Sequence, residues 1–77
     1  MELTIPMGTR GTAKEFGHAY SRSFLFKHGY NFYTTVGLLG VSSKLCSVNT
    51  QHGELIIKDN DILTYLGHNK WDVRPGN

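Results

Sequence analysis

The chain has few of the devices that usually stabilise a small protein. Its 77 residues include one cysteine, two prolines and only 18% charged residues. Cys46 is alone, so no disulfide can form within the chain. A domain of this length buries only roughly 60% of the surface its unfolded chain exposes, and such domains depend on metals, self-association or a partner. The sequence predicts one compact domain over residues 1–77, and we expect it to form homo-oligomers or to bind another macromolecule.

Long apolar runs are also missing. Two glycines interrupt the apolar cluster at residues 36–41, and no segment reaches the roughly 20 apolar residues of a membrane-spanning helix. Residues 1–7 are too short and too polar for the apolar core of a signal peptide. A lone cysteine in so small a protein is typical of a reducing compartment. We therefore expect a cytoplasmic protein with no membrane association.

Side chains that carry catalysis or bind metals are scarce and scattered. Each of the four histidines stands next to a glycine, and none pairs with another histidine or with Cys46 at the spacing of a zinc site. The acidic tripeptide at residues 59–61 lacks the further oxygen ligands of a calcium loop. Cys46 has apolar neighbours in place of the basic ones that activate a thiolate. The sequence predicts no metal, no cofactor and no enzymatic activity.

Aromatic residues are what the chain does have. Four phenylalanines, four tyrosines and one tryptophan offset a hydrophobic fraction of only 39%, because each large ring buries roughly 150–250 Å². We therefore expect the chain to fold.

The N-terminal third carries the clearest helix pattern. Thr12 and Glu15 stand at the spacing of a capping box, and Gly29 suits the end of a helix. One helical face collects the apolar residues Ala13, Phe16, Tyr20 and Phe24. These signals predict a helix over residues 12–28. Residues 23–28 equally fit the start of a strand, and Gly17 beside the apolar face predicts close packing against a sheet.

From residue 31 onward the pattern alternates with the period of a strand. The predicted strands cover residues 32–36, 45–48, 54–58, 62–66 and 70–74, with a further short one at residues 2–5. Turns are expected at residues 37–40, at 59–61 as a hairpin connection, and at 67–69. The predicted fold is α+β, with one N-terminal helix packed on an antiparallel meander or small barrel-like sheet of about 4–6 short strands.

Basic residues gather in the N-terminal third. Lys14, His18 and Arg22 repeat at four-residue spacing and form one stripe of the predicted helix, with Arg10 in the loop before it. The stripe is either a solvated face or a surface for phosphates or acidic proteins. Nucleic-acid binding is therefore the alternative function. A third possibility is a small anion or nucleotide ligand at the loop of residues 8–12 before the helix, as in a minimal enzyme.

Several apolar residues are difficult to bury in one thin core, above all Leu25, Phe26 and Tyr30, together with Leu38 and Leu39. Either they form an exposed patch that marks an interface, or the chain becomes extended near Phe24 and buries them in the sheet. The leading hypothesis is a small intracellular binding module that modulates another macromolecule, a protein above all. Its interface would be Leu25, Phe26 and Tyr30, surrounded by the basic residues. Accessory and inhibitor proteins of viruses and mobile elements are an analogy for it that rests on size alone.

Overall fold

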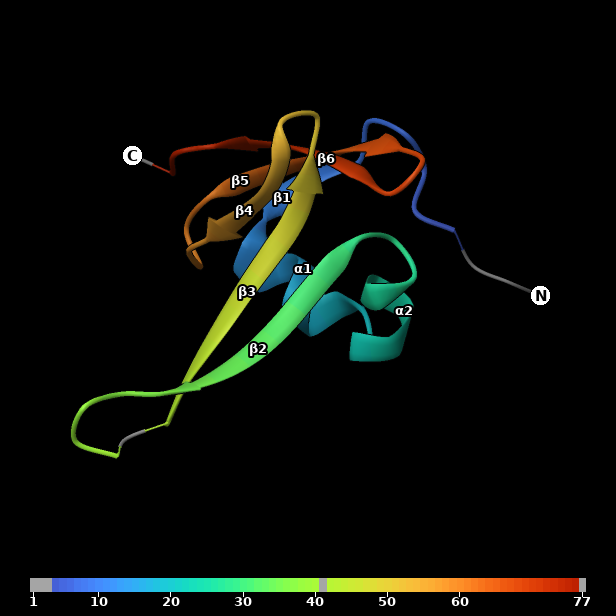
Figure 1. Ribbon diagram of the computed structural model, residues 1–77. Helices are drawn as coiled ribbons and strands as arrows, with labels where there is room; N and C mark the ends of the chain where they lie inside the picture. Colours follow the sequence, from blue (N-terminus) through green and yellow to red (C-terminus); the bar gives the residue numbers. More distant parts are fainter. Residues whose placement is uncertain (1–3, 41, 77) are drawn as a thin grey trace.

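The computed structural model describes residues 4–40 and 42–76, which form an α+β fold (Figure 1). These residues include two short helices and six strands, and the strands form two antiparallel sheets of three. The elements in chain order are β1 (Arg10–Thr12), α1 (Ala13–Ala19), α2 (Arg22–Phe26), β2 (Tyr30–Val36), β3 (Ser42–Thr50), β4 (Gly53–Ile57), β5 (Ile62–Gly67) and β6 (Lys70–Arg74). The predicted α+β class and the antiparallel strands are confirmed.

One sheet has the strand order β1-β5-β6. Its β5–β6 hairpin turns through His68 and Asn69, whose positive φ angles of 52° and 62° suit a tight hairpin turn. This turn lies where the sequence predicts it. Strand β1 pairs with β5 from Arg10 opposite Thr64 to Thr12 opposite Ile62. The expected loop before the helix is therefore partly a strand.

The other sheet has the strand order β2-β3-β4. Strands β2 and β3 pair over their whole shared length, from Tyr30 opposite Val48 to Val36 opposite Ser42. The predicted hairpin at residues 59–61 is wrong, because β4 and β5 belong to different sheets. The turn itself exists, and Asp61 closes it by accepting a hydrogen bond from the Lys58 N–H on its side-chain oxygen, at 2.9 Å.

Two helices stand where one is predicted. The backbone is extended at Tyr20, and Ser21 caps the second helix by accepting from the N–H of Phe24 at 3.2 Å. Thr12 caps the first helix by accepting from the N–H of Glu15, as predicted. Residues 22–26 are helical, which excludes the alternative strand. Residues 4 and 5 of the predicted N-terminal strand are not in a strand, and residues 2 and 3 lie outside the described residues.

The core is built around Trp71, which is completely buried. Its ring meets the rings of Phe16 and Tyr65 edge-on at centroid distances of 5.0 and 4.9 Å. Its indole N–H donates to the carbonyl oxygen of His28 at 2.7 Å, which satisfies the one polar atom of the side chain. Both helices and both sheets contribute to this core. The aromatic residues thus supply much of the buried apolar surface in a chain whose hydrophobic fraction is low.

Candidate functional site

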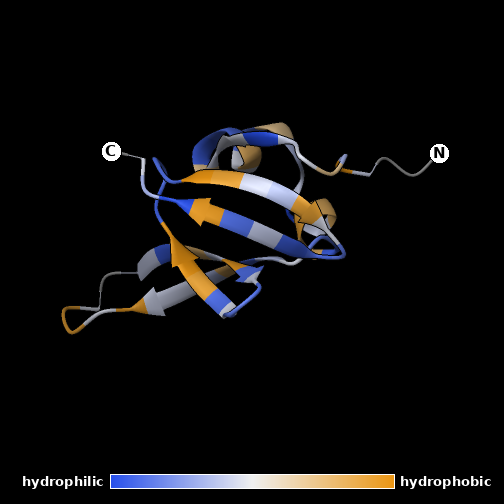
Figure 2. Ribbon diagram, turned by 90° about the horizontal axis from the view of Figure 1, so that it is seen from above, coloured by the Kyte–Doolittle hydropathy of each residue, from blue (hydrophilic) through white to orange (hydrophobic). Residues whose placement is uncertain are grey.

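The β2–β3 hairpin continues past the body of the protein as an arm. We define the arm as residues 34–44, without position 41, which is not described. Figures 1 and 2 both show it projecting from the rest of the molecule, and Figure 2 shows hydrophobic residues at its end. The arm sequence contains no acidic residue and one basic residue, Lys44.

The tip of the arm exposes aliphatic side chains. Leu38 is fully exposed, Leu39 exposes 91% of its surface, and Val36 exposes 70%. The turn is closed by a hydrogen bond from the N–H of Gly40 to the carbonyl oxygen of Gly37 at 2.9 Å, and Gly40 has a φ of +74° that favours glycine. This local geometry directs the two leucines away from the core.

A hollow of about 230 Å³ lies between one face of the β2–β3 hairpin and helix α1. We call it the arm groove. The residues lining it include Lys14, Gly17, His18, Phe32, Cys46 and Asp59. Alternate residues of a strand share a face, so Phe32, Thr34 and Val36 form one continuous surface from the groove to the tip. Lys44 opposite Thr34 lies on this same face.

The groove holds two weakly acidic groups, and both are kept protonated. Burial raises the pKa of the Cys46 thiol above its usual value. Burial likewise raises the pKa of Tyr30, whose hydroxyl donates to the carbonyl oxygen of Ala13 at 3.3 Å. A protonated thiol is a poor nucleophile. The raised pKa therefore disfavours thiolate chemistry at Cys46.

The predicted interface is only partly exposed. Leu25 and Tyr30 are buried in the core, so their assignment to an exposed patch is wrong. The break at Tyr20 gives α2 its own orientation and places Leu25 inward, and the alternation of β2 does the same for Tyr30. Phe26 exposes 48% of its surface. The largest exposures among the described apolar residues belong to Leu38 and Leu39, which the sequence marks only as difficult to bury.

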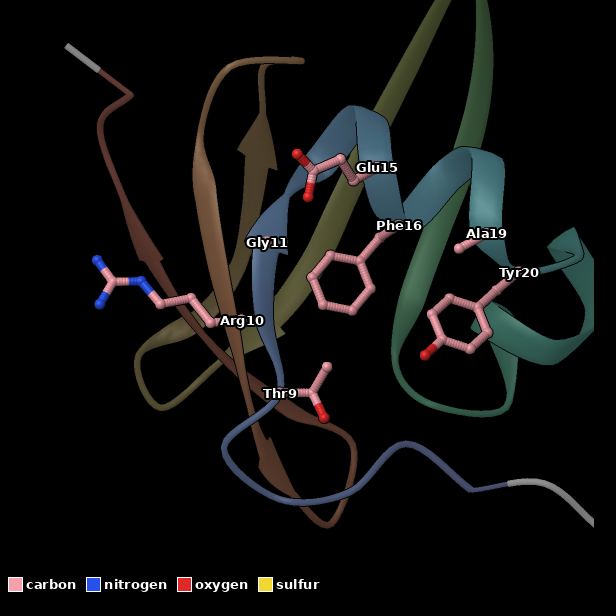
Figure 3. Close-up of a pocket in the computed structure, with 7 residues that line it drawn as sticks. All are labelled: Thr9, Arg10, Gly11, Glu15, Phe16, Ala19 and Tyr20. Carbon is pink, nitrogen blue, oxygen red and sulfur yellow. The ribbon is translucent and has the colours of Figure 1, made fainter.

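The predicted basic stripe is divided between two helices. Lys14 and His18 lie on α1 and line the arm groove, whereas Arg22 begins α2. The guanidinium carbon of Arg22 lies 4.9 Å from the ring centroid of Phe32, which brings Arg22 to the same groove. Arg10 lies apart from them on β1, and Figure 3 shows its side chain pointing away from Phe16 and Tyr20. Three of the four predicted residues thus meet at one surface.

The expected anion site before α1 is occupied by the protein itself. The N–H groups of Ala13 and Lys14 donate to the carbonyl oxygens of Asp61 and Asp59 at 2.9 and 3.2 Å, and that of Glu15 donates to Thr12. These three N–H groups are therefore bonded to oxygens of the protein itself and are not free for a phosphate. The hollow beside β1 and α1 measures about 160 Å³ and has the rings of Phe16 and Tyr20 on one side (Figure 3). Both this hollow and the arm groove are smaller than a typical small-molecule pocket of roughly 300–1,000 Å³.

The histidines lie on separate elements. His28 bonds through Nδ1 to the carbonyl oxygen of Phe24 at 2.8 Å and packs against its ring, while His52 and His68 lie in turns. Among residues 4–40 and 42–76, no three His, Cys, Asp or Glu side chains form a group that could hold a metal ion.

The outer face of the β2-β3-β4 sheet carries a hydrogen-bonded set that the sequence gives no signal for. Glu54 accepts hydrogen bonds from the hydroxyls of Tyr33 and Ser47, the latter at 2.8 Å. Ser47 is completely buried beneath these two side chains. The three residues come from three strands, so only the strand register brings them together.

Comparison with protein families, with curated proteins and with solved structures gives no match to this chain. Neither helix in the described part of the chain is long and apolar enough to cross a membrane.

Proposed function

We propose that this chain is a small protein-binding module that modulates its partner by inserting the tip of its arm into an apolar cleft of that partner. The observation that carries the proposal is the exposure of Leu38 and Leu39 at the end of a projecting hairpin. Burying each leucine in a partner contributes about 1.5–3 kcal/mol, whereas leaving it in water contributes nothing.

The shape of the tip also supports the proposal. A projecting turn reaches into a recess that a flat sheet face cannot enter, and a few fully buried residues dominate most interfaces. The core of the fold does not include the tip leucines, so their apolar character serves no packing role in this chain. The lone Cys46 supports the cytoplasm as the location of this module.

Capture from a lysate of the chain's native cells, treated with nuclease, tests the proposal. The tagged wild-type chain is compared with the double variant Leu38→Ser/Leu39→Ser and with Ile56→Ser, which removes an exposed aliphatic side chain on β4. We expect one stoichiometric protein on the wild type and on Ile56→Ser. The double variant should lose it while keeping its circular dichroism spectrum.

Three outcomes contradict the proposal. The double variant retains the captured protein, nuclease removes the bound material, or nothing binds to the wild type. The second outcome would favour the alternative function, nucleic-acid binding.

A further inference from the structure

From the charge and shape of the arm groove, we infer that it binds an acidic peptide segment of the partner and holds one apolar side chain of that segment. This inference rests on the proposed function and specifies the chemistry of the partner. The groove joins the tip through one continuous face of the hairpin, along Phe32, Thr34 and Val36. A partner seated on the tip therefore extends naturally along the groove.

The charges around the groove favour carboxylates. Lys14 lines it, Arg22 lies over Phe32, and Lys44 follows on the same face of the hairpin. All three cations are exposed. The lining itself pairs Lys14 with one acidic residue, Asp59, and Arg22 and Lys44 beside it add the excess positive charge. The excess of positive charge attracts an acidic segment and repels a basic one. The ring of Phe32 and the half-buried Cys46 supply the apolar wall for a side chain between the cations.

Gly17 is the second observation that points to a ligand. It stands in the middle of α1, where glycine costs about 1 kcal/mol relative to alanine. A Cβ at this position would meet no atom within 4 Å, so the predicted close packing against a sheet is wrong. The fold gives no reason for a glycine here. Its absent side chain leaves the groove open, which is what an incoming side chain requires.

The groove is poorly suited to nucleic acid. Proteins that bind single strands stack bases on free aromatic faces, but Arg22 lies over a face of Phe32, whose half-buried ring still lines the groove. The tip beyond the groove is aliphatic and offers neither stacking nor phosphate contacts. An acidic peptide uses both the cations and the apolar wall.

Selection from a random 12-residue peptide library on the purified chain tests the inference, with two pairs of matched variants. Lys14→Glu reverses a charge in the groove, and Arg10→Glu makes the same change outside it. Gly17→Met fills the groove, and Gly17→Ala adds only a methyl group. We expect peptides on the wild type to be enriched roughly twofold or more in Asp and Glu around an aliphatic or aromatic residue.

The affinity of one selected peptide is then measured on the wild type and on the four variants. Its Kd should rise roughly tenfold with Lys14→Glu and with Gly17→Met, and less than about twofold with the two controls. The inference is overturned if the selected peptides lack acidic enrichment, if the groove variants bind as well as the controls, or if oligothymidine displaces the peptide. The double variant Leu38→Ser/Leu39→Ser leaves the groove unchanged. If this variant loses the captured protein while the groove variants bind it as well as their controls do, the proposed function holds and the present inference fails.

Discussion

At the scale of single residues, the same amino acid has opposite roles at two places in this chain. Leu25 is completely buried, whereas Leu38 is fully exposed. Replacing a buried leucine by alanine costs about 2–5 kcal/mol through lost burial and the cavity left behind. Neither cost applies to an exposed leucine.

We therefore expect Leu25→Ala to lower the free energy of unfolding by about 2–5 kcal/mol and Leu38→Ala to change it by less than about 0.5 kcal/mol. Urea denaturation of both variants measures this difference. Equal losses at the two positions would mean that the tip packs against the body of the protein.

Glu54 gives the residue-scale prediction for pH. Hydrogen bonds from Tyr33 and Ser47 hold its pKa below the usual value of 4.5. A carboxylate with a depressed folded-state pKa stabilises the fold fully above its unfolded pKa, and this contribution is lost as the pH falls through the folded one. The thermal midpoint of the wild type should therefore exceed that of Glu54→Gln near neutral pH.

We expect this gap to close as the pH is lowered from about 7 to about 3, because the wild-type carboxyl then becomes protonated. Tyr33→Phe removes one of the two donors. The gap in thermal midpoint between the wild type and Tyr33→Phe should therefore be smaller, and it should also close as the pH is lowered. A gap that stays constant with pH would show that the carboxylate charge plays no part.

At the scale of elements, the division of the predicted helix depends on Ser21. Its side chain accepts from the N–H of Phe24 and begins α2, which in turn places Leu25 in the core. Ser21→Ala should cost about 1 kcal/mol of stability. The matched change Ser23→Ala lies within the same helix on an exposed position, and we expect it to alter stability by less than about 0.5 kcal/mol. Equal losses of stability in the two variants would contradict the capping role of Ser21.

The sequence predicts the elements well wherever their signal is local. The alternation in residues 32–36 and 70–74 and the cap at Thr12 all appear in the structure. The break at Tyr20 is missed because the apolar repeat continues through Phe24, although Ser21 carries a recognisable cap signal. The pairing of β1 with β5 joins residues far apart in the chain, and nothing in either segment alone specifies it.

The candidate site was less predictable than the fold for the same reason. Leu38 and Leu39 stand out in the sequence as difficult to bury, but their exposure depends on how far the β2–β3 pairing extends beyond the body. The meeting of Lys14, His18 and Arg22 at one groove depends on the angle between two helices, which periodicity along one predicted helix does not give.

At the scale of the whole molecule, the arm makes this small protein elongated, with extents of 42 × 31 × 22 Å. The core occupies the body, where both sheets and both helices meet around Trp71. The arm adds no buried residue at its tip, so the molecule carries a surface that only association can cover. We thus assign stability to the body and propose binding for the arm.

Site-specific photo-crosslinking tests this assignment most directly. Benzoylphenylalanine is placed at position 38 on the tip or at position 56 on β4, and each chain is irradiated in its native cells. We expect a discrete cross-linked band from position 38 that contains a second, different protein, and no such band from position 56. No band from position 38, or a band that holds only a second copy of this chain, would contradict it.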